Sequence, residues 1–288
     1  MTAYKPTGSL KDFIEAGKVK TRVLGSVERH ILAKPMDTSR RTNVLHPSDM
    51  VDDAWCHRAS YFHILGQQPV KRNFSFRILS VFEEGHAIHA KWQGWFKEMG
   101  NLWGKWKCHE CNQIFWGRPQ DHDPKVKPDG YEYLEVTLDY KPLHIAGHAD
   151  GLLLEFGDPL MLEIKSIGAG TLRWEAGELF AEHNGDFEKT WKAITNPFMK
   201  HVNQVQIYMK LAELLELEYQ PKEAVLIYES KASQDVKEFV VPKSDFGISH
   251  LFEAAQMIAD AVKAKVPPVC NIGTNGCKRC EGYTDESN

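Results

Sequence analysis

The chain has 288 residues, of which 42% are hydrophobic and 26% are charged, a composition typical of a globular protein rather than of a disordered one. Its formal net charge of -4 excludes a protein that coats nucleic acid through bulk positive charge, although a local basic groove stays compatible with it. The longest apolar runs are too short to span a bilayer, and the first residues lack the apolar core of a secretory signal. We therefore expect a protein of the cytoplasm of a cell, or of an infected one, without membrane attachment.

The N-terminal part of the chain is predicted to be helical. Residues 1–45 carry scattered charge and predict an N-terminal extension, with a short helix at 9–17 followed by irregular chain. A helical pattern starts at residue 46 and continues to residue 65, with Ser48 as its expected N-cap. A second helix is predicted over 74–99, because apolar residues recur there at helical spacing.

Strands are predicted in the second half of the chain. Residues 101–142 are rich in Trp, Gly and Pro and carry a pair of cysteines, which predicts a small inserted module. Beyond them the residue patterns predict four strands and two helices, and Pro267 and Pro268 end the last helix. This order indicates an α/β (α+β) fold in which helices flank a sheet. The strands are expected at 143–156, 160–167, 223–231 and 236–242, and the helices at 196–217 and 249–265.

Three charged residues lie in or beside two of these strands. Glu163 and Lys165 project to one face of their strand, because alternate strand residues share a face, while Ile164 points the other way. If the two strands pair as a hairpin through a turn at 157–159, Asp150 arrives near Glu163. Two carboxylates there would suit Mg²⁺ or Mn²⁺, and the lysine could orient or activate a water molecule. On this segment alone, an ion pair at a sheet edge explains the charges equally well.

Two helices carry further candidates. Gln204 and Tyr208 are four residues apart, so they share one face of the helix predicted at 196–217; the alternative is a core tyrosine with a locally satisfied glutamine. His89 follows Gly85 by four residues on the helix predicted at 74–99. For a lone histidine a core or surface role is the ordinary alternative, and His86 is a nearby decoy.

In this order, His89, Asp150, Glu163-x-Lys165 and Gln204-x-x-x-Tyr208 resemble the RecB-type branch of the PD-(D/E)xK nuclease superfamily. That branch includes the AddB and RecB nuclease domains, the CRISPR-adaptation exonucleases of the Cas-four type and similar stand-alone bacteriophage proteins. The resemblance covers about residues 50–285. It implies a restriction-endonuclease-like mixed β-sheet flanked by helices, within a nuclease domain at 46–288.

The same resemblance implies a metal-dependent DNA exonuclease that hydrolyses phosphodiester bonds at single- or double-stranded ends, in phage or bacterial recombination or repair. A recombination protein or a second copy of the chain is an implied partner. Two alternatives stay open: a structure-specific endonuclease or nickase of the same fold, and a non-catalytic module that binds DNA ends. The implied ligands of Mg²⁺ or Mn²⁺ are His89, Asp150, Glu163 and the main-chain carbonyl of Ile164. Lys165 would position or activate the attacking water, and Gln204 and Tyr208 would steady the lysine or the DNA backbone.

We expect no disulfides among the six cysteines, because the cytosol keeps thiols reduced, and their spacing indicates metal binding instead. Cys56 together with a C-terminal group of three resembles the iron-sulfur staple of the AddB and Cas-four families, in which four thiolates hold a [4Fe-4S] cluster. In those families the two closely spaced cysteines of the C-terminal group usually precede the longer gap, whereas in this sequence they follow it. The implied clasp consists of residue 56 and residues 268–282. Its ligands would be Cys56, Cys270, Cys277 and Cys280.

The remaining cysteines, Cys108 and Cys111, resemble half of a zinc ribbon within the module predicted at 101–142. No second pair follows within that module, so a zinc site there would need His122 with Asp121 or Asp123. A knuckle without metal is the alternative. Another partition joins Cys108, Cys111, Cys277 and Cys280 into one zinc site and leaves Cys56 and Cys270 free.

Overall fold

The computed structural model describes residues 23–34, 40–67, 74–123, 125–273 and 276–283. The helix expected at 9–17 lies outside these residues. Within the described ranges, no helix is both long enough and apolar enough to cross a membrane.

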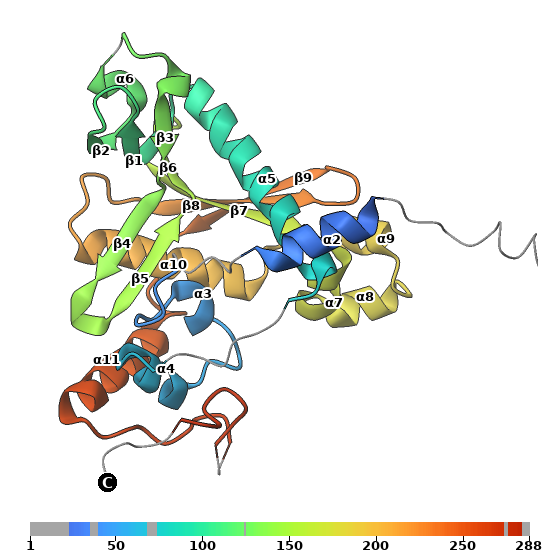
Figure 1. The fold of residues 1–288 in the computed structure, drawn as a ribbon, viewed down its shortest axis with the longest axis vertical. Coiled ribbons are helices and arrows are strands. Elements are labelled where there is room, and N and C mark those ends of the chain that lie inside the picture. Colours follow the sequence, from blue (N-terminus) through green and yellow to red (C-terminus); the bar gives the residue numbers. More distant parts are fainter. Residues whose placement is uncertain (1–22, 35–39, 68–73, 124, 274–275, 284–288) are drawn as a thin grey trace, which may run out of the picture.

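A mixed sheet forms the centre of the molecule (Figure 1). Its strands follow the order β2-β1-β6-β7-β8-β9, and β3 pairs with β1 on the edge opposite β2. Only the β7–β8 pair is parallel; the other strand pairs of this sheet are antiparallel. This mixed sheet with flanking helices confirms the expected fold class. The strands are β1 (Leu102–Cys108), β2 (Ile114–Gly117), β3 (Tyr131–Tyr133), β6 (Gly151–Leu153), β7 (Leu160–Ile167), β8 (Glu223–Ser230) and β9 (Val236–Pro242).

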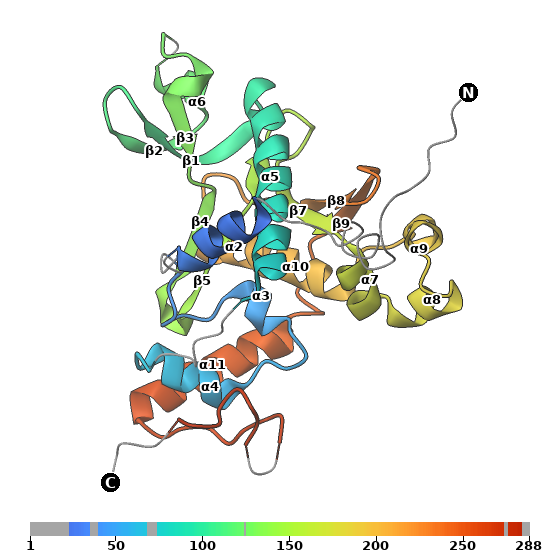
Figure 2. The same cartoon turned by 45° about the vertical axis from the view of Figure 1, so that its right-hand side comes forward.

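Helices cover both faces of this sheet. Side chains of β7 alternate between the faces, so Met161 joins the core under α10 (Met199–Leu214) whereas Ile164 joins the core under α5 (Phe76–Glu98). Figures 1 and 2 show the two helices on opposite sides of β7 and β8. Because β7 is buried on both faces, a charged residue within it must find its partners inside the protein. The connection from β7 to α10 contains α7 (Ala169–Glu175), α8 (Gly177–Glu182) and α9 (Phe187–Ala193).

The segment expected as one strand at 143–156 is broken at Asp150. Its first half, β5 (Ile145–Ala149), pairs with β4 (Val136–Tyr140) in a separate two-stranded sheet, and its second half is β6. At the break the chain passes close to its neighbours: a Cβ on Gly151 would lie 2.5 Å from Leu102 Cδ1. The expectation of a single strand is therefore wrong, although its pairing with β7 is confirmed.

The segment expected to be helical at 46–65 is also divided. It forms α3 (Pro47–Met50) and α4 (His57–Ile64), separated by a turn. The expected N-cap is wrong: Ser48 lies inside α3, whose N-cap is His46 and whose first residue is a proline, a common first residue of helices. Helix α2 (Leu24–Ala33) forms where irregular chain was expected, and it packs against α5.

The other long helices are found where the sequence predicts them: α5, α10 and α11 (Ser249–Ala264), which packs against α4. The segment 101–142 supplies β1, which joins the central sheet because Leu102 and Trp103 pair with Leu153 and Leu152 of β6. Apart from β4, which pairs with β5, its remaining parts extend outward beside the C-terminal end of α5, as Figure 2 shows. We call this projection the outer lobe; it consists of the outer half of β1 with β2, β3 and α6 (Pro119–His122). The module boundaries themselves stay a prediction.

Candidate functional site

The β6–β7 hairpin brings two carboxylates to one place. Gly151 of β6 pairs with Leu162 of the antiparallel strand β7. Asp150, the residue before Gly151, is therefore opposite Glu163, the residue after Leu162. Asp150 Oδ2 accepts a hydrogen bond of 2.6 Å from the backbone N–H of Ile164. This contact fixes the Asp150 carboxylate against the edge of β7, where the sequence places it.

Helix α5 adds a histidine to the two carboxylates. His89 Nδ1 lies 3.0 Å from Asp150 Oδ1, and Gln93, one turn later, donates to the backbone carbonyl of Asp150 at 3.0 Å. Burial lowers the pKa of His89, but the hydrogen bond and negative charge of Asp150 outweigh it and raise that pKa overall. Gly85 allows the helix to come this close to β7, because a Cβ at that position would lie 3.3 Å from Ser166 Oγ. His86, on the same helix, is exposed.

Lys165 belongs to a hydrogen-bonded chain that crosses from β7 to α10. Its Nζ lies 2.6 Å from Glu163 Oε1 and donates to Gln204 Oε1 at 3.0 Å. Gln204 Nε2 in turn donates to the Tyr208 hydroxyl at 2.8 Å. The ion pair considered as the ordinary explanation of Glu-x-Lys is therefore present, and it is part of a larger buried network. The four side chains lie together as the helical and strand spacings predict.

Glu163 is the unusual member of this network. It is 3% exposed, and its Oε2 is a buried oxygen without a hydrogen-bond partner among the described residues. Burial, reinforced by the charge of Asp150 and opposed by Lys165, raises the pKa of Glu163 to about 7. An unpaired buried carboxylate oxygen costs free energy, and a bound cation would satisfy it.

The residues here fit a hard divalent cation in part. Two ligands at right angles around an ion with bonds of about 2.1 Å stand about 3.0 Å apart, which is the separation of His89 Nδ1 and Asp150 Oδ1. The carbonyl of Ile164 lies on the Asp150 side of β7, because the N–H and C=O of one strand residue point to the same edge. However, His89, Asp150 and Glu163 do not form a group whose ligand atoms all lie within 4.8 Å of one another, unlike the cysteines below. Glu163 is turned toward Lys165 and would have to rotate to join such an ion.

Two residues that the sequence argument missed adjoin Lys165. Tyr228 of β8 is the ladder partner of Lys165, and its hydroxyl accepts from the backbone N–H of Phe198 at 2.9 Å. The same hydroxyl lies 2.6 Å from Nδ1 of His201. The hydroxyl accepts from Phe198 and has its one proton free for Nδ1; that donation would leave the histidine neutral, with its own proton on Nε2. Burial, and then the charges of Lys165 and Lys200, lower the pKa of His201 to about 3.

A sequence signal for His201 does exist. His201 precedes Gln204 by three residues and Tyr208 by seven, so all three share one face of α10. Tyr228 carries no comparable signal, because its role depends on the register of β8 against β7.

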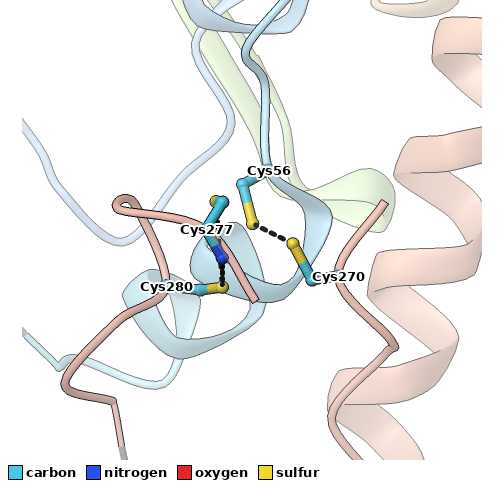
Figure 3. Close-up of side chains that lie close together, drawn as sticks. All are labelled: Cys56, Cys270, Cys277 and Cys280. Atoms are coloured by element: carbon cyan, nitrogen blue, oxygen red, sulfur yellow. Dashed lines mark hydrogen bonds between the residues drawn. The ribbon is translucent and has the colours of Figure 1, made fainter. Parts of the chain in front are cut away.

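The second candidate site is a group of four cysteines, drawn in Figure 3. Cys56 comes from the residue before α4, and Cys270, Cys277 and Cys280 come from the C-terminal segment after α11. Their four Sγ atoms lie within 4.8 Å of one another. The expected grouping is therefore present, and the alternative partition that joins Cys277 and Cys280 to the other cysteine pair is wrong.

Hydrogen bonds on both sides of the four-cysteine group fasten the C-terminal segment to the start of α4. The backbone N–H of His57 donates to Asn271 Oδ1 at 2.9 Å, and Arg279 forms a 2.9 Å ion pair with Asp52. Farther along, Tyr283 stacks on Phe62 with ring centroids 5.2 Å apart. Chain segments more than two hundred residues apart are thus held together by several independent contacts.

The four-cysteine group has the donors of a thiolate-bound metal centre. The Cys56–Cys270 and Cys277–Cys280 Sγ atoms are each 3.8 Å apart, which is about the edge of a tetrahedron of sulfurs around one ion with bonds of about 2.3 Å. A cubane cluster binds each cysteine through a different iron and so holds the sulfurs farther apart. A recess of about 720 Å³ adjoins three of the cysteines and gives room for such a change. Backbone N–H groups of Gly273 and Ile272 outweigh burial and lower the pKa of Cys270 to about 7, which favours the thiolate that metals bind.

The third candidate site lies in the outer lobe. Ligand atoms of Cys108, Cys111 and His122 lie within 4.8 Å of one another. The expected aspartate does not complete this group among the described residues. Asp121 is instead paired with Arg118 at 2.9 Å, and Asp123 accepts from the backbone N–H two residues later.

No protein-family model matches this sequence, and neither does any curated protein. The solved structures that are similar in fold include two of an alkaline exonuclease and one of SSO0001. An alkaline exonuclease from Laribacter hongkongensis, LHK-Exo, is 11% identical with a TM-score of 0.40, and LHK-Exo in complex with dAMP is 13% identical with a TM-score of 0.43; both matches cover 78% of this chain and 90% of the other. The structure of SSO0001 is 14% identical with a TM-score of 0.36 and covers 87% of each chain. These likenesses are too low to carry an argument about activity, which therefore rests on the residues of the site.

Proposed function

We propose that this protein is a metal-dependent deoxyribonuclease that hydrolyses phosphodiester bonds from DNA ends, an exonuclease of phage or bacterial recombination or repair. The observation that carries the proposal is the unpartnered, buried oxygen of Glu163, which lies beside Asp150 and is joined through its other oxygen to Lys165. A salt bridge alone would leave no reason for that oxygen to be orphaned. A cation-binding site gives one.

In the proposed enzyme, Mg²⁺ or Mn²⁺ would be held by His89, Asp150, Glu163 and the carbonyl of Ile164. When bound, such an ion polarises a phosphoryl oxygen and lowers the pKa of a coordinated water. Recruitment of Glu163 would turn its carboxylate away from Lys165.

The ammonium group of Lys165 would then face the reacting phosphate. There it would orient the attacking water and offset negative charge that develops on the phosphate. Gln204 keeps one contact to Lys165, and Tyr208 orients Gln204, so both act as positioning residues. His201, neutral and with its proton on Nε2, would be a fixed hydrogen-bond donor for a phosphate oxygen on the same face.

The decisive experiment is degradation of end-labelled single- and double-stranded DNA with Mg²⁺ or Mn²⁺. Asp150→Ala and Lys165→Ala should abolish cleavage. Asp158→Ala, in the exposed turn of the same hairpin, and Lys222→Ala, on an exposed lysine just before β8, are matched controls that should keep it. Full activity in Lys165→Ala would overturn the proposal.

Two further substrates separate the proposal from its alternatives. An exonuclease leaves closed circular DNA intact, whereas a nickase or endonuclease converts it to nicked or linear forms. Tight binding of DNA ends without cleavage in any of several divalent metals would identify a non-catalytic end-binding module instead.

For the four-cysteine group we propose a metal centre that ties the start of α4 to the C-terminal segment. The sequence resemblance implies a [4Fe-4S] cluster, and the 3.8 Å sulfur separations favour a single tetrahedral ion as the second candidate. The visible spectrum and metal content of the purified protein decide between them. A cluster gives brown protein that absorbs at roughly 400 nm and contains iron, and zinc gives colourless protein.

A further inference from the structure

The outer lobe ends in a turn that gathers three metal-ligating side chains. Cys108 is the last residue of β1, and its backbone N–H donates to the carbonyl of Gln113 at 2.9 Å, which closes the turn toward β2. Cys111 lies within that turn. His122 ends α6, and its Nε2 is 3.5 Å from Cys111 Sγ. Three separate pieces of local structure thus deliver two thiols and an imidazole to one point.

The imidazole of His122 is held in place by aromatic packing. Its ring stacks on Phe115 of β2, with centroids 4.2 Å apart and an interplanar angle of 11°, and it meets the edge of Tyr131 at 6.0 Å. Such contacts fix the orientation of a ring on a lobe surface where it would otherwise sample several rotamers. The histidine is therefore set with a ring nitrogen toward the thiols before any ion arrives.

The first thiol is likewise held in place. Cys108 is buried by the surrounding side chains, and the hydrogen bond from its backbone N–H to Gln113 fixes it at the end of β1. Cys111 is exposed, so an ion and its reagents can reach the group from solvent.

We propose that Cys108, Cys111 and His122 form a zinc site, separate from the four-cysteine group and from the nuclease residues. Two thiolates and an imidazole are donors that select zinc over the hard cations Mg²⁺ and Ca²⁺. With three protein ligands, the fourth tetrahedral position takes a water molecule, because Asp121 is engaged by Arg118 and Asp123 by the backbone of Lys125.

The zinc would join the β1–β2 turn to α6. His122 at the end of α6 already stacks on Phe115 of β2. The inner end of β1 pairs with β6 next to Asp150, so the ion would fix the outer end of a strand whose inner end borders the candidate active site. The zinc site itself does not depend on whether the protein cuts DNA.

The test is the zinc content of the full chain. Cys108→Ser/Cys111→Ser should contain one equivalent of zinc per chain less than the wild type, and His122→Asn should bind zinc more weakly. The matched control, Cys277→Ser/Cys280→Ser, should keep that equivalent whichever metal the four-cysteine group binds. Equal zinc content in the wild type and in Cys108→Ser/Cys111→Ser would overturn the proposal.

A second measurement uses the wild-type chain, in case the double variant does not fold. Alkylation of Cys111 by iodoacetamide, followed by peptide mapping, should be at least tenfold slower with one equivalent of added zinc than after treatment with a chelator. His122→Asn should lose most of this protection. An alkylation rate at Cys111 that is the same with and without zinc would contradict the proposal.

Discussion

At the scale of single residues, the position of the Lys165 ammonium group depends on the side-chain amide of Gln204. Hydrogen bonds to charged groups contribute about 1.5–3 kcal/mol, so Gln204→Ala should lower the cleavage rate by about 10- to 100-fold. Tyr208→Phe removes only the hydroxyl that accepts from the Gln204 amide, so it should lower the cleavage rate less. Steady-state cleavage assays should show the loss in kcat rather than in KM. Gln256→Ala, on the exposed face of α11, is the matched control, and an equal loss there would contradict a positioning role.

His201 provides a pH test that needs no DNA. The pKa of His201 is lowered to about 3 in the folded protein, against about 6.5 in an unfolded chain. Above pH 6.5 the residue is neutral in both states and contributes nothing. Below it, the unfolded chain takes up a proton that the folded chain does not, so the free energy of unfolding falls as the pH drops toward 3.

His201→Gln should remove this loss of stability. Between neutral pH and about pH 5, the free energy of unfolding of the variant should fall by roughly 2 kcal/mol less than that of the wild type. Urea unfolding at a series of pH values measures the difference. His86→Gln, on the exposed side of α5, should follow the wild type. Identical pH dependence in His201→Gln and the wild type would contradict the neutral, buried state of this histidine.

At the scale of elements, the sequence predicts what depends on local periodicity. The strand at 160–167 and the helix around Gln204 are found where their patterns place them, and alternation correctly puts Glu163 and Lys165 on one face. The break at Asp150 is not predictable in this way, because both halves of the segment are apolar and only their different partners, β4 and β7, divide them. The same holds for the rotation of Glu163 toward Lys165, which depends on three-dimensional packing rather than on spacing.

The break at Asp150 requires a residue without a side chain at the start of β6. In Gly151→Ala the new Cβ would lie 2.5 Å from Leu102 Cδ1 and 3.3 Å from Leu162 Cδ2. Such overpacking should lower the free energy of unfolding by about 1–3 kcal/mol, measured by chemical denaturation. Gly170→Ala, in α7 with no atom within 4 Å of the new Cβ, is the control and should be neutral or slightly stabilising. Equal effects at the two positions would contradict the close approach described for β6.

At the scale of the whole molecule, the four-cysteine group joins distant parts of the chain. If its metal is the main link, Cys280→Ser should raise the amide hydrogen-exchange rates of α4 and α11 while β7, β8 and α10 keep their protection. Cys111→Ser, in the outer lobe, should leave α4 and α11 unchanged. Unaltered exchange in α4 and α11 of Cys280→Ser would show that hydrogen bonds such as Arg279–Asp52 suffice.

The position of these sulfurs along the chain also has a consequence for synthesis. The first is at residue 56 and the last at residue 280, so a nascent chain carries an incomplete ligand set until translation has passed residue 280. By analogy with a covalent link, closing a loop of this length removes conformational entropy of the unfolded chain equivalent to roughly 5 kcal/mol. A ribosome that stalls between Cys277 and Cys280 would leave three of the four thiols and an open loop. If the group binds the proposed metal, the bound metal would mark the chains that have been translated through the last cysteine.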